Sequence, residues 1–147
     1  MNGSGEAQGR AEAARDAMYA GDRVAHALGM VVSAVGPASA TVDMTVTDTM
    51  CNGLDVCHGG VIFSLADAAM AFASNGLGGT HLASDASIDW LAPARVGDQL
   101  TATATESARR GRTGLFHVEV RGPEGVIAVF RGKTKMVSTD GPAPAPS

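Results

Sequence analysis

A single carboxylate, Asp67, lies within an otherwise apolar segment that runs from Val61 to Ala73. The segment is rich in helix formers and lacks proline, so it is expected to form a buried helix. Ser64 and Ser74 stand three residues before and seven residues after Asp67, which places all three on one polar stripe. No basic residue stands at a neighbouring helical position, so the carboxylate must be paired, protonated or functional. We expect an active carboxylate; the alternative is a core aspartate that is hydrogen-bonded across an interface.

The loop before this segment contains His58, Gly59 and Gly60. At the start of a helix the first backbone N–H groups are unpaired and lie at the positive end of the helix dipole. Two glycines allow a ligand to approach the backbone closely, as an oxyanion hole for acyl transfer requires. The alternative is a tight turn from loop to helix with no chemical role.

Gly59 and Asp67 are too far apart to act on one carbonyl within a single chain. Asp67 lies eight residues beyond Gly59, which corresponds to roughly 12 Å at the standard helical rise. If both act on the same carbonyl, the aspartate must come from a second copy of the chain that lies antiparallel to the first. This spacing therefore predicts a symmetric dimer with two shared sites.

Cys51 and Cys57 are the two cysteines of the chain, and without a secretion signal they are interpreted as reduced thiols. No metal site is expected, because His26, His81 and His117 lie in separate segments without paired ligand spacing. Cys57 as a nucleophile is a weaker alternative, since no base and orienting residue accompany it in the pattern.

The composition indicates one globular domain over residues 1–147, with 45% hydrophobic residues and a formal net charge of −4. This charge gives no support to nucleic-acid binding. No apolar run reaches membrane-spanning length and no signal peptide is recognised, so a cytoplasmic protein is expected. Residues 1–9 and 141–147 are polar or rich in glycine and proline, and both are expected to be disordered tails.

Hydrophobic periodicity predicts the remaining elements. Short helices are expected at the beginning of the chain, then a hairpin, the long buried helix and four long strands. This order favours an α+β fold with an antiparallel sheet. The expected ranges are helices at 11–20 and 22–28, hairpin strands at 30–35 and 39–46, and strands at 81–91, 99–107, 114–121 and 126–137.

Four short motifs follow one another in a particular order and spacing: Met50-Cys-Asn-Gly53, Cys57-His-Gly-Gly60, Phe63-Ser-Leu-Ala-Asp67 and Ile88-Asp-Trp-Leu91. Together they resemble the phenylacetate-pathway acyl-CoA thioesterases of the hotdog superfamily, and the resemblance spans roughly residues 17–137. It implies a five- or six-stranded antiparallel sheet wrapped around one long helix. It also implies a homodimer with shared active sites that assembles into a homotetramer. Members commonly carry an arginine where this chain has Ala92, although Arg95 follows closely.

The resemblance also implies roles for four catalytic residues. It places the catalytic carboxylate on Asp67 and the oxyanion donor on the backbone N–H of Gly59. The amide that positions water or substrate falls on Asn52, for which a plain Asn-Gly turn is the alternative. His58 matches the residue that shapes the turn beside the thioester.

Four further residues are expected to bind substrate. Ser64 and Gly60 lie beside the catalytic positions, and Arg109 and Arg112 form a basic turn suited to the phosphates of coenzyme A. A solvated turn is the alternative for the arginines. Alternating basic residues on a later strand form a second candidate for phosphate contact: Arg131, Lys133 and Lys135.

The predicted reaction is hydrolysis of an aromatic acyl-CoA, such as phenylacetyl-CoA or a hydroxylated form, to the free acid and coenzyme A. No separate cofactor is expected, because coenzyme A is part of the substrate. Two alternatives stay open. A hotdog hydratase or dehydratase would use His58 as a proton-transfer base on an acyl-thioester, and a noncatalytic module would bind acyl-CoA without releasing thiol.

Overall fold

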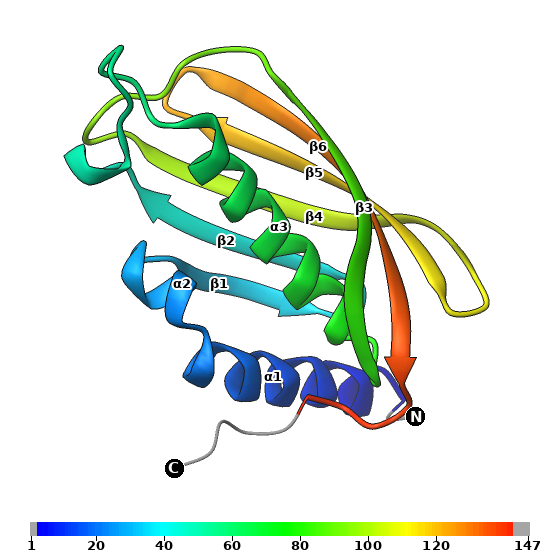
Figure 1. Ribbon diagram of the computed structural model, residues 1–147. Helices are drawn as coiled ribbons and strands as arrows, with labels where there is room; N and C mark the ends of the chain where they lie inside the picture. Colours follow the sequence, from blue (N-terminus) through cyan, green and yellow to red (C-terminus); the bar gives the residue numbers. More distant parts are fainter. Residues whose placement is uncertain (1–2, 143–147) are drawn as a thin grey trace.

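The computed structural model describes residues 3–142 of the chain and contains one six-stranded antiparallel sheet (Figure 1). The strands follow the order β1-β2-β4-β5-β6-β3. The predicted α+β architecture is confirmed, with six strands. The elements are α1 (Gly3–Gly21), α2 (Arg23–Ala27), β1 (Val31–Gly36), β2 (Ser39–Thr45), the short 3₁₀ helix η1 (Asp48–Met50), α3 (Gly59–Asn75), β3 (Thr80–Trp90), β4 (Gln99–Arg110), β5 (Thr113–Gly122) and β6 (Gly125–Ser138).

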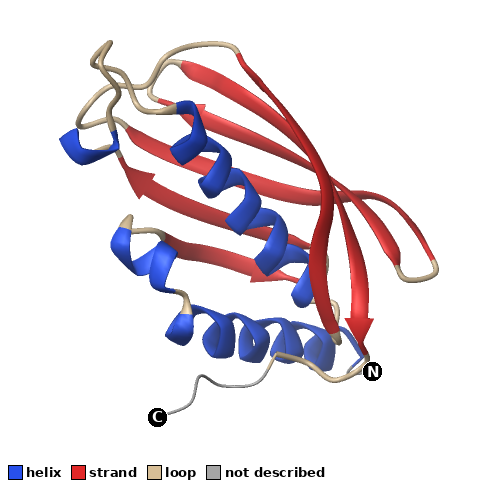
Figure 2. Ribbon diagram, in the orientation of Figure 1, coloured by secondary structure: helices blue, strands red, loops and turns tan. Residues whose placement is uncertain are grey.

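The sheet curves around α3, which contacts all six strands. Figure 2 shows α3 on the concave face of the sheet and α1 along the edge formed by β1. Strong helix formers and the absence of proline explain the helix over 59–75, and Gly76 provides its C-cap. Its apolar side chains face the sheet, where Phe72 packs in the same core as Phe116 and Phe130. Burying a phenylalanine side chain of this kind contributes about 1.5–3 kcal/mol.

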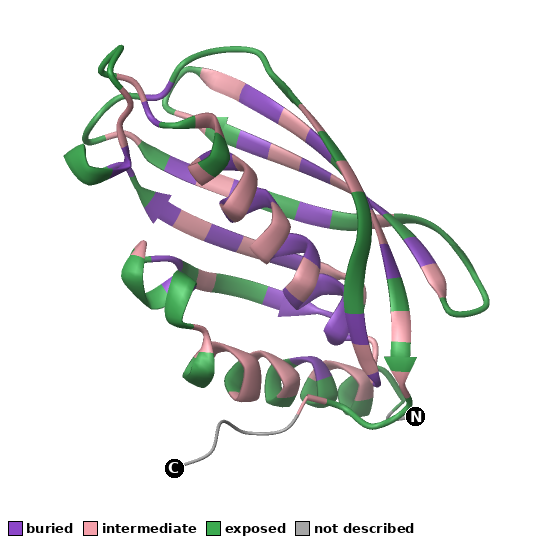
Figure 3. Ribbon diagram, viewed as in Figure 1, coloured by how far each residue is buried: buried purple, intermediate pink, exposed green. Residues whose placement is uncertain are grey.

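Most strands alternate between buried and accessible residues, as expected for a sheet with one covered face (Figure 3). On β6 the buried Phe130, Gly132 and Thr134 alternate with the more accessible Arg131 and Lys133. β3 departs from this pattern, because it is an edge strand and seven of its eleven residues are exposed. Within one chain, β3 is therefore the more exposed edge of the sheet, although Ala86 and Ile88 on its inner face pack against the core.

The N-terminal segment differs from the prediction. Residues 3–9 belong to α1, whereas a disordered tail was expected over 1–9. The Gln8 Nε2 atom donates a hydrogen bond to the Val35 carbonyl at 2.8 Å, and Ala11 is fully buried. Contacts with the sheet thus stabilise a segment whose composition favours disorder. In the predicted C-terminal tail, Gly141 and Pro142 have no regular structure, and 143–147 lie outside the described residues.

The second short helix follows the prediction closely. The Asp22 side chain accepts a hydrogen bond from the Ala25 N–H at 2.9 Å and caps α2. Gly29 then adopts a positive φ of 68°, which ends the helix at little cost for a glycine. Among residues 3–142, no helix combines the length and hydropathy needed to cross a membrane.

Candidate active site

The turn that precedes α3 is held by short backbone hydrogen bonds. The Cys57 N–H donates to the Ala94 carbonyl and the His58 N–H donates to the Met50 carbonyl, both at 2.7 Å. His58 is the N-cap of α3, and its Nδ1 atom accepts from the Gly60 N–H at 3.0 Å. This bond uses the Gly60 N–H and shows how His58 shapes the turn.

Gly59 presents the free donor of this turn. Within residues 3–142 its N–H makes no hydrogen bond, although it lies at the positive end of α3. The Trp90 Nε1–H donates to the Gly59 carbonyl at 3.2 Å. The indole also packs so closely that a Cβ at position 59 would lie 3.0 Å from its ring. A side chain here would push the indole aside by a few tenths of an ångström, so the close approach favours glycine. Trp90 holds the peptide that carries the candidate oxyanion donor.

Asn52 has a turn role that agrees with the alternative raised from the Asn-Gly pair. Its Oδ1 atom accepts from the Leu54 N–H at 2.9 Å and from the Val56 N–H at 3.4 Å. The Asn52 Nδ2 group donates to no atom of residues 3–142. The side chain thus holds its own loop through the oxygen, while the amide nitrogen stays available to a ligand.

Asp67 lies two turns into α3 and lines a cavity of about 300 Å³. The carboxylate is half-buried and makes no hydrogen bond or ion pair within residues 3–142. Burial raises the pKa of Asp67 above its usual value. A core aspartate satisfied inside its own chain would need a partner, and the described residues provide none. The cavity is lined by Met18, Asp67, Met70, Ala71, Ser74, Asn75, Thr80, His81, Leu82, Ala83 and Pro142.

The other polar residues on the stripe are satisfied locally. The Ser64 hydroxyl donates to the Gly60 carbonyl at 2.9 Å, and the Ser74 hydroxyl donates to the Ala71 carbonyl at 3.2 Å. Neither hydroxyl therefore donates to Asp67. Ser64 lies between the turn and Asp67 along the helix, so it is placed to contact a ligand that extends from one to the other.

One chain does not bring the four catalytic candidates together. Asn52, His58 and Gly59 are grouped at the N-terminal end of α3, but none of them lines the cavity that contains Asp67. The structure therefore has the separation between Gly59 and Asp67 that the helical rise predicts, because α3 is a regular helix from Gly59 to Asn75.

The basic turn lies at the other end of the sheet. Figure 1 shows that the turn between β4 and β5 is remote from the beginning of α3 in the same chain. Arg109 forms an ion pair with Glu106 at 3.0 Å, and Arg112 donates to the Met136 carbonyl at 3.5 Å. Both guanidinium groups therefore have some of their donors engaged.

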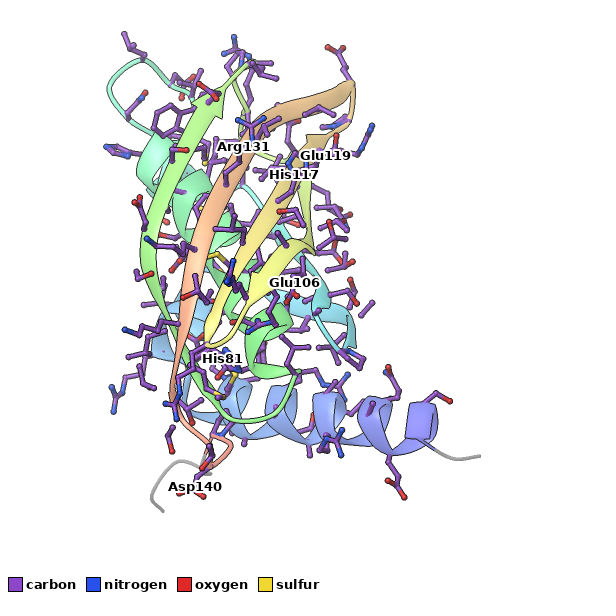
Figure 4. The ribbon with its side chains drawn as sticks, turned by 90° about the vertical axis from the view of Figure 1, so that its right-hand side faces the viewer. His81, Glu106, His117, Glu119, Arg131 and Asp140 are labelled. Carbon is purple, nitrogen blue, oxygen red and sulfur yellow. The ribbon has the colours of Figure 1, made fainter. Side chains whose placement is uncertain are left out.

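The second basic candidate lies on the convex face of β6. Arg131 and Lys133 line a hollow of about 380 Å³, whereas Lys135 does not. Figure 4 places Arg131 and His117 toward one end of the sheet and His81 toward the other. Among residues 3–142, no three His, Cys, Asp or Glu side chains gather closely enough to hold a metal ion.

Several residues beside Asp67 were not predicted. Asn75 exchanges hydrogen bonds with the backbone of His81, accepting from its N–H at 2.8 Å and donating to its carbonyl at 3.2 Å. The His81 Nε2 atom contacts the Gly78 carbonyl at 2.9 Å. This network joins the end of α3 to the beginning of β3 and forms one wall of the cavity. The Ile88-Asp-Trp-Leu91 motif includes Trp90, but no local pattern in the sequence indicates the residues that form this wall of the cavity.

An antiparallel sheet wrapped around one central helix, with a glycine turn and a helical aspartate, defines a hotdog protein. The family model of the Thioesterase superfamily matches residues 54–129. The chain is 43% identical over 122 residues to acyl-coenzyme A thioesterase PaaI of Escherichia coli, covering 82% of this chain and 87% of that protein.

Solved structures agree with this assignment. The E. coli PaaI protein from the phenylacetic acid degradation operon superposes with a TM-score of 0.87 and 39% identity, covering 94% of this chain and 99% of that one. A point mutant of the phenylacetic acid degradation protein PaaI from Thermus thermophilus gives a TM-score of 0.77 and 31% identity, covering 79% and 100%. The chain therefore belongs to the thioesterase superfamily and is a thioester hydrolase.

Proposed function

We propose that this protein hydrolyses an aromatic acyl-CoA, such as phenylacetyl-CoA or hydroxyphenylacetyl-CoA, to the free acid and coenzyme A. The observation that carries the proposal is Asp67, a half-buried carboxylate without a partner in residues 3–142 that lines a cavity. The similarity to the E. coli acyl-CoA thioesterase supports the same reaction class. Coenzyme A arrives as part of the substrate, so the proposal requires no separate cofactor.

The chemistry follows from charge development at the thioester carbonyl. The Gly59 N–H binds the carbonyl oxygen, where negative charge appears as the tetrahedral intermediate forms. Asp67 either attacks the carbonyl carbon to give an anhydride or removes a proton from an attacking water. Both routes break the C–S bond, and the leaving thiolate takes up a proton and departs as coenzyme A. In the first route water then hydrolyses the anhydride, which releases the free acid and restores the Asp67 carboxylate. The Asn52 amide positions the water or the acyl group, while Ser64 and Gly60 contact the substrate between these groups.

The proposed site is shared between two subunits. One subunit contributes Gly59 and Asn52, and its partner contributes Asp67, because one chain separates them by roughly 12 Å of helix. The largely exposed edge strand β3 supports pairing between copies. The proposal includes a homotetramer made of two such dimers. A cytoplasmic location is also part of it, because Cys51 and Cys57 are free thiols.

Mixing two inactive variants tests the shared site. Asp67→Ala and Asn52→Ala proteins are unfolded together, refolded and assayed for thiol release. If the residues come from different subunits, mixed dimers contain one intact site and activity returns. If activity stays absent although mass spectrometry detects mixed dimers, both residues belong to one subunit in each site.

The aromatic preference is supported by the size of the cavity beside Asp67. Its volume of about 300 Å³ and its apolar lining by Met70 and Ala71 suit a flat ring better than a long alkyl chain. The test compares kcat/KM for phenylacetyl-CoA, 4-hydroxyphenylacetyl-CoA and palmitoyl-CoA by thiol release. Each tenfold ratio corresponds to about 1.4 kcal/mol of transition-state discrimination. Equal values, or a preference for palmitoyl-CoA, would refute the aromatic assignment without affecting the thioesterase assignment.

Arg109 and Arg112 are proposed to contact the phosphates of coenzyme A. Their present partners, Glu106 and the Met136 carbonyl, leave other guanidinium donors for a phosphate. Replacing both arginines with alanine should raise KM and leave kcat nearly unchanged. An Arg131→Ala, Lys133→Ala double variant is the matched control, because these residues line the hollow on the convex face. If the control raises KM instead, the convex face binds the phosphates.

A further inference from the structure

The two cysteines face each other across the loop that carries Asn52. Cys51 and Cys57 form an isolated antiparallel bridge. On one side of this pair the Asn52 N–H donates to the Val56 carbonyl at 2.9 Å. On the other side the His58 N–H donates to the Met50 carbonyl at 2.7 Å. The hydrogen bonds flank the pair and do not join its two members, so this is a non-hydrogen-bonded pair.

This kind of pair has the spacing that a disulfide requires. In a non-hydrogen-bonded antiparallel pair the Cα atoms lie about 4.5 Å apart and the side chains project from the same face. Disulfides span Cα separations of about 4.4–6.8 Å. The backbone therefore already holds Cys51 and Cys57 at a distance that a disulfide can bridge.

The sulfur atoms are free to approach each other. The Cys51 thiol is half-buried and contacts the Thr47 carbonyl at 3.7 Å, and the buried Cys57 thiol contacts the His58 carbonyl at 3.8 Å. These are weak contacts for a thiol. Burial, and then the charge of nearby Cys51, raise the pKa of Cys57 to about 11.

We propose that Cys51 and Cys57 form an oxidisable dithiol that closes into an intramolecular disulfide when the protein meets a peroxide. Nothing in the proposed hydrolysis uses either thiol, so this site is separate from the thioesterase chemistry. The bridge would enclose a ring of seven residues that includes Asn52. The loop that carries the Asn52 amide would then be fixed at both ends by a covalent bond.

The reaction with hydrogen peroxide balances in two steps. The more accessible Cys51 thiolate attacks one peroxide oxygen, so that an S–O bond forms, the O–O bond breaks and hydroxide leaves as water after protonation. The Cys57 sulfur then attacks the Cys51 sulfenic acid, forming the S–S bond and releasing a second water that takes the Cys57 proton. The two thiols lose two electrons and the peroxide gains them. The raised pKa of Cys57 lowers its thiolate fraction and so slows this second step.

Intact-mass analysis of the full-length protein tests the dithiol directly. Protein treated with equimolar hydrogen peroxide, quenched and unfolded in iodoacetamide should lose the mass of two hydrogens and take up no alkyl group. Dithiothreitol should restore two alkylatable thiols. A Cys51→Ser variant is the matched control, since it retains Cys57 and cannot form the bridge. Two alkylated thiols after treatment, a gain of oxygen without bridging, or a covalent dimer on non-reducing electrophoresis would each overturn the proposal.

A second measurement tests the effect on the loop. Hydrogen exchange of the amides in residues 53–56 should slow in the oxidised protein, and the melting temperature should rise above that of the reduced protein. Unchanged exchange or a lower melting temperature in verified disulfide-containing protein would refute the fixed loop. Both readouts are independent of catalytic activity, so a failure of the thioesterase proposal does not affect them.

Discussion

Replacing Asp67 with asparagine separates a catalytic role from a structural one. Asparagine has almost the same shape as aspartate, and the Asp67 carboxylate makes no hydrogen bond or ion pair within residues 3–142. The substitution should therefore remove no stabilising contact of the chain. If Asp67 acts as nucleophile or general base, kcat should fall about 100- to 10,000-fold. This loss corresponds to about 2.7–5.5 kcal/mol of transition-state stabilisation.

The same variant should gain stability at neutral pH. Burial raises the folded-state pKa of Asp67 above its unfolded value, so folding disfavours the charged carboxylate. The stability contributed by this shift is fully present below the unfolded pKa and is lost as the pH rises through the folded pKa. Wild type and Asp67→Asn should therefore melt at similar temperatures at about pH 3, below the unfolded pKa of 3.8. At pH 8 the variant should melt at the higher temperature, because only the wild type carries a buried charge.

Thermal melts at both pH values and thiol release from phenylacetyl-CoA provide the measurements. Asp48→Asn is the matched control, because Asp48 is an exposed carboxylate in η1. This variant should change neither the melting temperature nor kcat. Retention of more than a tenth of wild-type kcat would refute the catalytic role of Asp67. A lower melting temperature at pH 8 would show that the carboxylate has a stabilising partner in the assembled protein.

Three further substitutions test the packing and the turn. Gly132→Ala would place a Cβ against the Met70 side chain, so we expect a loss of about 1–3 kcal/mol in the free energy of unfolding, measured with urea. Trp90→Phe removes the hydrogen bond to the Gly59 carbonyl, and kcat should fall by up to about tenfold with an unchanged melting temperature; an unchanged kcat would exclude a positioning role. Asp22→Ala removes the α2 cap and should lower the free energy of unfolding by about 1 kcal/mol in the same urea titration. Asp22→Asn should retain most of the stability that the cap contributes.

Local patterns were sufficient to predict α3 and its carboxylate. The apolar stretch from Val61 to Ala73 has the length and composition of a buried helix, and Asp67 is conspicuous because it is charged. The first turn of the helix was less accessible to prediction. His58 caps α3 through its ring nitrogen, although histidine is not among the preferred N-cap residues.

Long-range contacts account for what the sequence did not predict. Trp90 contacts Gly59 from 31 residues away, and no periodicity in either segment specifies that pairing. The helix over residues 3–9, where a tail was predicted, has a similar cause, because Gln8 donates a hydrogen bond to Val35 across 27 residues. Composition describes the preference of an isolated segment, whereas these contacts depend on where the sheet places its edge.

The position of β3 determines when the site can form during synthesis. β3 follows α3 directly in the chain, yet within residues 3–142 it pairs only with β6, so that Thr80 lies opposite Ser138. A nascent chain that ends before β6 has no partner strand for β3, and β3 supplies the wall of the Asp67 cavity from Thr80 to Ala83. Loop closure over such separations is slow compared with local helix formation. The Asp67 helix can therefore form early, while the pocket around it must wait until the last strand has left the ribosome.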